Sequence, residues 1–306
     1  MKRQVAARRE GVARWVSRAV GLFVLLTSAE ASAIDPVDAP PDAGDFDALS
    51  TGTGDRHDHW AGTGRRAFVA GVYDVGLFYL QPGLSLGYGE PHHRWFGLSG
   101  SVNMSVSGGT GKLAIRGVAP HFDARLGVRY ESPINQEFLA PQDVFTREDT
   151  ELEDYGASRY LSIDAELAGN VPMPGGHLIA AASAYGVLGT PRDLFVFEEA
   201  LKVVIDPPFL WRARLGYMAE LPFGGEREHA LRIGVAAEGV HNPERPLFVA
   251  RVGPLVSLPL TCHLEMVAAA MLVAWSRDRL GLLGADFGEI ALRYRWASGD
   301  PVPGFP

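Results

Sequence analysis

The stretch from Val118 to Glu131 alternates apolar and charged side chains almost without interruption. In an extended strand, consecutive side chains point to opposite faces of the sheet. The pattern therefore predicts one apolar and one ionic face: Val118, Phe122, Ala124, Leu126, Val128 and Tyr130 against His121, Asp123, Arg125, Arg129 and Glu131. A soluble sandwich turns such an ionic face to water, whereas a membrane barrel turns the apolar face to lipid. One strand is compatible with both folds, so the choice depends on whether the pattern recurs.

The same alternation recurs over most of the chain between Leu77 and Trp296. This recurrence predicts an all-β fold, a single antiparallel transmembrane β-barrel of about ten strands. Twelve strands are the alternative, in which residues 66–76 and 195–205 join the wall of the barrel.

The third predicted strand ends at Glu131 and is unusually long. Its alternation changes parity between Ile115 and Val118, which predicts a β-bulge or a strand that extends beyond the membrane. In the ten-strand arrangement, the long connections after the third, fifth and ninth strands all fall on one side, and short turns fall on the other. This segregation is typical of a transmembrane barrel.

The last predicted strand, 287–296, ends in an aromatic residue and alternates cleanly. Its two faces carry Ile290, Leu292, Tyr294 and Trp296 against Glu289, Arg293 and Arg295. It resembles the terminal β-signal of bacterial outer-membrane proteins, although the tail 297–306 continues past the aromatic residue. The resemblance implies an outer-membrane location in a Gram-negative cell and recognition by the barrel-assembly machinery.

The N-terminus has the features of an export signal. Basic residues precede the apolar run 19–26, and Ala31-Ser32-Ala33 supplies a small-residue cleavage site. We therefore predict four segments: a signal peptide at 1–33, a disordered acidic lead at 34–66, the outer-membrane barrel at 67–297 and a short C-terminal tail at 298–306.

The composition limits the partners of the chain. Its formal net charge is −8, and removal of the basic signal makes the mature chain more acidic, which argues against nucleic acid as a partner. Cys262 is the single cysteine, so no intrachain disulfide can form. A closed sheet would give stability without one.

The predicted inner faces of the strands carry charges of both signs. A small barrel can fill its lumen with such side chains and pair them. We therefore expect a non-enzymatic outer-membrane barrel, either a structural or adhesive scaffold or a narrow porin-like pore, with a charged and occluded lumen. The expected lumen-facing residues are Asp123, Arg125, Arg129, Glu131, Asp164, Glu166, Arg212, Arg214, Glu220, Arg232, Glu238, Arg251, Glu265, Glu289, Arg293 and Arg295.

Two other functions are compatible with this pattern. A ten-strand barrel of this length resembles the omptin surface proteases, which place acidic residues and a histidine near the extracellular rim. The rim candidates here are Asp143, Asp149 and Asp154, but their loop contains no histidine, and we assign no catalytic residue and no cofactor. A soluble periplasmic β-barrel is the other alternative.

The long loop after the third predicted strand is rich in carboxylates. Its candidate metal-binding residues are Glu148, Asp149, Glu151, Glu153 and Asp154. Clustered carboxylates on an external loop can share divalent cations with the phosphates of surface lipids. A solvated acidic loop without a ligand is the alternative. The expected partners are therefore outer-membrane lipid, the barrel-assembly machinery, and a small solute or divalent cation.

Overall fold

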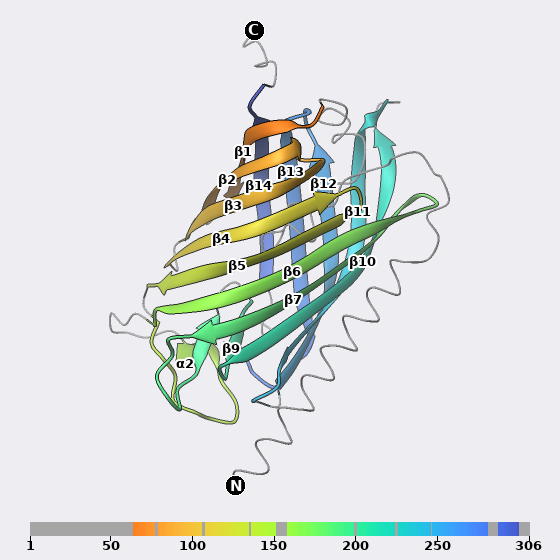
Figure 1. Ribbon diagram of the computed structural model, residues 1–306. Coiled ribbons are helices and arrows are strands. Elements are labelled where there is room, and N and C mark those ends of the chain that lie inside the picture. The colour runs from red at the N-terminus through yellow and green to blue at the C-terminus, as the bar shows by residue number, and fades with distance from the viewer. Residues whose placement is uncertain are drawn as a thin grey trace. The chain divides into compact units, whose positions relative to one another are not determined.

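The computed structural model describes residues 64–76, 79–105, 108–134, 136–150, 158–198, 201–223, 226–245, 247–280 and 287–299. Twelve antiparallel strands form one closed barrel (Figure 1). The predicted signal peptide, almost all of the acidic lead and most of the C-terminal tail lie outside the described residues.

The wall strands follow the chain around the barrel, and β14 closes it by pairing with β1. Their bounds are β1 Arg66–Gly76, β2 Tyr79–Glu90, β3 Arg94–Ser105, β4 Gly108–Ala119, β5 Phe122–Pro133, β6 Tyr160–Met173, β7 Gly176–Leu188, β10 Phe209–Phe223, β11 Glu226–Asn242, β12 Leu247–Pro259, β13 Leu264–Trp275 and β14 Phe287–Ala297. Two short strands, β8 Val196–Glu198 and β9 Val203–Ile205, pair only with each other. A helical turn, α2, spans Arg147–Thr150. No helix within the described ranges is long and apolar enough to cross a membrane.

The wall strands have an apolar outer face because their side chains alternate between the two sides of the sheet. Leu126, Ile163 and Val235 are each between 47% and 58% exposed, whereas Arg129, Arg251 and Arg293 are buried. An Arg or Lys on the lipid face at mid-membrane costs about 2–4 kcal/mol, so slipping a charged strand by one residue is strongly disfavoured. The fold is thus an outer-membrane-type β-barrel, as the sequence predicted.

The predicted count of ten strands was wrong, and the alternative of twelve is correct. Residues 66–76 form β1, which pairs with both β2 and β14. Residues 195–205, the other segment of that alternative, do not join the wall; they contain β8 and β9.

The second strand that the predicted count lacked comes from the long strand predicted to end at Glu131. In the structure this stretch forms two strands, β4 and β5. The chain turns at Pro120 and His121, and Ala119 pairs with Phe122 across the turn. Proline has no N–H for a sheet ladder, and His121 has a φ of 71°, in the left-handed region. The turn explains the change of parity: Val118 is buried, whereas Phe122 faces outward.

The connections differ in length at the two ends of the barrel. The end reached after β1, β3, β5, β7, β11 and β13 carries the long connections 134–159, 189–208 and 276–286. We call it the loop end. The opposite end, called the turn end, carries short turns such as 174–175 and 120–121.

Candidate functional site

The interior of the barrel contains buried ion pairs between neighbouring strands. Arg293 donates to Asp74 through Nε at 2.7 Å and through Nη2 at 2.9 Å, across the β1–β14 closure. Arg116 donates to both carboxylate oxygens of Asp123 in the same way on β4 and β5. Removing one partner of a buried pair costs about 3–5 kcal/mol, because the other charge stays buried and unpaired. Losing one member of such a pair would therefore destabilise the closed wall.

The structure places the predicted lumen-facing residues within this network. Arg212 donates to the Ser183 hydroxyl at 3.1 Å, and its guanidinium lies over the ring of Tyr185. The side chain of Glu289 is outside the described part of the chain. The other predicted charges form these pairs: Arg129 with Glu131 and Asp164, Arg214 and Arg251 with Glu238, Arg232 with Glu220, Arg295 with Glu265, and Arg125 with Glu166.

Four charged residues of the interior were not among the predicted lumen-facing residues: Asp74, Lys112, Arg116 and Glu198. Asp74 lies on β1, which was not counted as a strand, and Arg116 lies on β4, next to the undetected turn. The change of parity before Val118 was the signal that could have located this turn. No local pattern could have indicated Glu198, because its partner Arg129 is 69 residues away.

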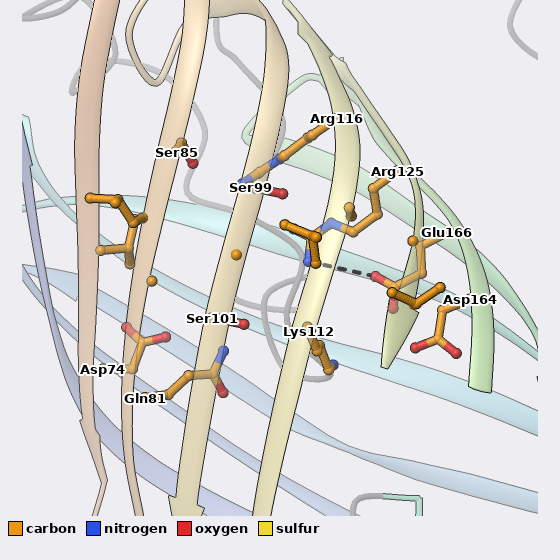
Figure 2. Close-up of a pocket in the computed structure, with 18 residues that line it drawn as sticks. Asp74, Gln81, Ser85, Ser99, Ser101, Lys112, Arg116, Arg125, Asp164 and Glu166 are labelled. Atoms are coloured by element: carbon orange, nitrogen blue, oxygen red, sulfur yellow. Dashed lines mark ion pairs between the residues drawn. The ribbon is translucent and has the colours of Figure 1, made fainter. Parts of the chain in front are cut away.

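One side of the interior, along β1 to β6, contains a cavity of about 70 Å³ lined by both polar and apolar residues (Figure 2). Hydroxyl groups and charges of both signs surround it. Its polar lining is Asp74, Gln81, Ser85, Ser99, Ser101, Lys112, Arg116, Arg125, Asp164 and Glu166. Across the barrel, inward residues of β7 and β10 to β13 form a buried apolar cluster instead: Ile179, Met218, Ala236, Leu255, Ala269 and Met271. The interior is therefore partly open and lined by many charged and polar groups on one side, and apolar and packed on the other.

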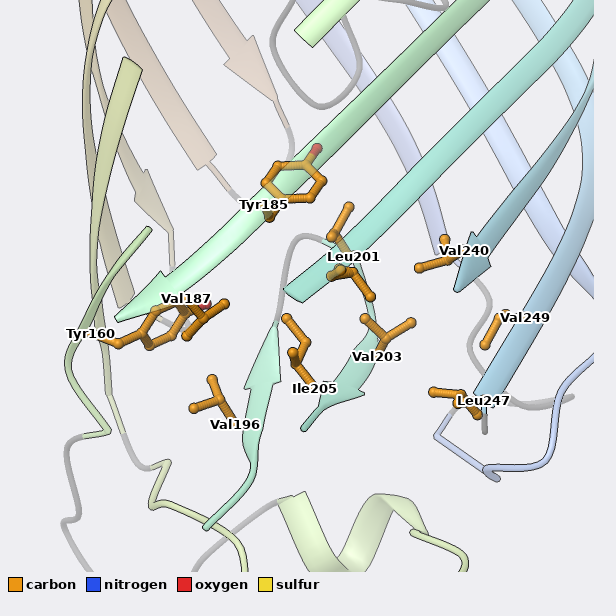
Figure 3. Packing of buried hydrophobic residues seen from close by; sticks show 11 residues of the cluster. Tyr160, Tyr185, Val187, Val196, Leu201, Val203, Ile205, Val240, Leu247 and Val249 are labelled. Carbon is orange, nitrogen blue, oxygen red and sulfur yellow. The ribbon is translucent and has the colours of Figure 1, made fainter. Parts of the chain in front are cut away.

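A hairpin made of β8 and β9 lies at the loop end of the interior, and all six of its strand residues are buried. Val196, Val203 and Ile205 pack against residues of the inner wall (Figure 3). These wall residues come from β6, β7, β10, β11 and β12: Tyr160, Tyr185, Val187, Leu210, Val240, Leu247 and Val249. Burial of such side chains is worth about 1.5–3 kcal/mol each, so the hairpin is held mainly by apolar contact.

An ionic contact joins this hairpin to β5 and β6. Arg129, which is 1% exposed, lies 2.9 Å from Glu198 of β8, 2.6 Å from Glu131 and 2.8 Å from Asp164. The Tyr160 hydroxyl donates to the other oxygen of Glu198. One arginine is thus shared by two wall carboxylates and one hairpin carboxylate.

A second contact joins the hairpin turn to β12. Arg251 donates through Nη2 to the Leu201 carbonyl at 2.5 Å and to the Lys202 carbonyl at 3.3 Å. Its Nη1 donates to Glu238 at 2.5 Å. Four strands separate β5 from β12 on one side of the barrel and six on the other. The hairpin is therefore bonded to nearly opposite walls and spans the loop end of the interior.

The connections at the loop end form a further apolar layer on the hairpin. Phe197 and Val204 alternate with the wall-facing residues, so their side chains lie on the other face of the hairpin. They belong to a buried cluster with residues of the long connections: Leu139, Phe145, Phe195 and Leu280. Arg245 donates to both oxygens of Asp278, and its guanidinium lies 4.7 Å from the centre of the Phe145 ring. Both faces of the hairpin are thus covered by side chains.

The structure describes part of the predicted metal-binding loop. Asp149 accepts hydrogen bonds from the Thr146 amide at 2.6 Å and from its hydroxyl at 2.8 Å, which lower the pKa of Asp149. Glu148 is exposed, and Glu151, Glu153 and Asp154 lie outside the described residues. Among the residues that can be placed, no three His, Cys, Asp or Glu side chains gather in a way that could hold a metal ion.

The acidic residues considered for a protease rim have separate roles where they are described. The carboxylate of Asp143 is 94% exposed and lies 3.6 Å from the guanidinium of Arg277. Asp149 is engaged at the start of α2. Asp154 is outside the described residues.

The comparisons with known proteins give architectural likeness only. No family model and no curated protein matches the chain. Among solved structures it is similar to the KdgM porin, at 10% identity and a TM-score of 0.37, over 74% of this chain and 98% of that chain. It is also similar to the NanC porin, at 7% identity and 0.32, and to the β domain of the Bordetella autotransporter BrkA, at 13% and 0.36. Each of these two matches covers 76% of this chain and 98% of the other. At these values the likeness carries no information on what this chain binds or transports.

Proposed function

We propose that this chain is a non-enzymatic outer-membrane barrel whose lumen is closed at the loop end by the β8–β9 hairpin. The observation that supports this is the bonding of one hairpin to β5 through Glu198 and to β12 through Leu201 and Lys202. A segment fixed to both walls obstructs a solute that enters from the loop end. The resting protein is then a scaffold, and it becomes a narrow pore only when the hairpin leaves.

The filling of the barrel agrees with this proposal. An eight-strand barrel is just wide enough for side chains to fill, and a porin of 16–18 strands leaves an aqueous channel, so in a barrel of intermediate size the side chains inside decide whether it is open. Here the wall has twelve strands, and the apolar cluster around Met218 and Met271, each at most 1% exposed, occupies part of the interior. A soluble periplasmic barrel is not supported, because Leu126, Ile163 and Val235 would be in water.

Conductance measurements in planar bilayers test the proposal. The intact protein should show no steady open state. A variant in which residues 196–205 are replaced by a short Gly-Ser linker should conduct steadily, because the hairpin that obstructs the loop end of the lumen is removed. Heat-modifiable mobility in detergent gels would show that both proteins keep a closed barrel.

Two results would count against the proposal. Steady conductance of the intact protein on the scale of a general porin would refute the occluded lumen. A folded hairpin-deleted variant that stays closed would show that another part of the chain blocks the barrel.

A further inference from the structure

The inner faces of β4 and β5 bring four cations together. The strand register places Lys112 opposite Arg129 and Arg116 opposite Arg125. Like charges directly opposite each other on a sheet are destabilising. Such an arrangement is stable only when anions compensate the cations.

The three arginines of this group are compensated to different degrees. Arg116 has the bidentate contact to Asp123, and Arg129 has three carboxylates within 2.9 Å. Arg125 has a single ion pair among the described residues, to Glu166, at 3.9 Å. This distance is longer than a hydrogen bond, and the Nε atom of Arg125 is buried without a hydrogen-bond partner.

Arg125 lines the cavity on this side of the interior, as Figure 2 shows. Ser85 of β2, and Ser99 and Ser101 of β3, present hydroxyl groups to the same cavity. One water needs roughly 10–15 Å³ of cavity measured in this way, so about 70 Å³ holds on the order of five waters or one small ion. The cavity thus combines an under-compensated guanidinium with neutral donors. The carboxylates that also line it, those of Asp74, Asp164 and Glu166, pair with Arg293, Arg129 and Arg125.

We propose that this cavity is a binding site for a small oxyanion, a carboxylate or a phosphate. Arg125 binds the anion through charge-assisted hydrogen bonds, and the serine hydroxyls donate to its remaining oxygens. Glu166 is the internal competitor for Arg125, because its carboxylate is the group that an entering anion replaces. Binding at this site does not require the barrel to conduct, so the site and the hairpin closure can fail independently.

Isothermal titration calorimetry on the purified barrel in detergent, at low ionic strength, tests the proposal with inorganic phosphate and acetate as probes. Arg125→Gln should weaken binding at least about tenfold, as expected when a charge-assisted contact is lost. Glu166→Gln should have the opposite effect and tighten binding about tenfold, because the competing charge is removed. Arg94→Gln, which changes an exposed arginine at the turn end of β3, is the matched control and should leave binding unchanged.

Arg125→Gln and Glu166→Gln should change the affinity of the anion in opposite directions, and this pair of results decides whether the site exists. Loss of binding in Arg125→Gln together with tighter binding in Glu166→Gln supports the site for whichever probe binds. Binding that is unaffected by either substitution would overturn it, as would the absence of binding in both the intact protein and Glu166→Gln. Each variant is checked for heat-modifiable mobility, and if Arg125→Gln does not fold, the direction of the Glu166→Gln effect decides.

Discussion

Arg129→Gln is the substitution that most directly tests the attachment of the hairpin to the wall. The guanidinium of Arg129 lies within 2.9 Å of carboxylates from Glu131, Asp164 and Glu198. Glutamine keeps a polar side chain but removes the positive charge. Three buried carboxylates then lose the guanidinium that they share, and two of them belong to the wall while the third belongs to the hairpin.

The magnitude follows from the cost of a broken buried ion pair, about 3–5 kcal/mol. The Arg129–Glu198 ion pair is part of what holds the hairpin against the wall, so its loss shifts the equilibrium toward the undocked hairpin. Since every 1.4 kcal/mol changes an equilibrium tenfold, the population with an undocked hairpin should rise by roughly two to three and a half orders of magnitude. Single-channel recording in planar bilayers should then show frequent openings.

Arg232→Gln is the matched control. Arg232 is also buried and pairs with a carboxylate, Glu220 at 2.9 Å, but its described contacts do not include the hairpin. The Arg232→Gln variant should lower the stability of the barrel without increasing the frequency of channel openings. If folded Arg129→Gln protein stays as closed as the intact protein, or if both variants open equally, the assigned role of Arg129 is wrong.

Three other predictions concern the wall, the turn and the loop. Leu126→Arg places a charge on the lipid face and should lower the free energy of unfolding by up to about 2–4 kcal/mol in urea titrations in lipid vesicles, whereas Leu126→Ile should change it little; equal stability of the two variants would contradict the assigned outer face. His121→Cys, in a Cys262→Ser background, should react with a membrane-impermeant maleimide added at the turn end, because the residue lies in a turn; protection from the reagent would favour one continuous strand. The Thr146 hydrogen bonds lower the pKa of Asp149 below 3.8 in the folded protein, so their contribution to stability is complete above about pH 3.8 and is lost as the pH falls through the lower folded value. The Thr146 amide should therefore lose hydrogen-exchange protection at acidic pH in the intact protein, while Asp149→Asn shows no such pH dependence.

The sequence by itself determined the class of fold and the orientation of most strands. The alternation in stretches such as 161–167 and 290–296 allows only one face of each strand to meet lipid, because a charge on that face is costly. The alternation relates residues that are close in the sequence, so it predicts the outer face correctly wherever a strand is uninterrupted. It missed the turn at Pro120 and His121, because a tight turn without glycine was interpreted as part of a strand.

The tertiary structure decided the strand count, the position of the hairpin and the pairing of the charges. Apart from Glu198, the residues of β8 and β9 are apolar on both faces, and this pattern indicates burial but not what covers the strands. Only the closed barrel brings Glu198 to Arg129, and Arg251 to the carbonyls of Leu201 and Lys202. The alternation of side chains along a strand relates residues that are two positions apart. These contacts join residues about 50 to 70 positions apart, and the closed sheet is what brings them together.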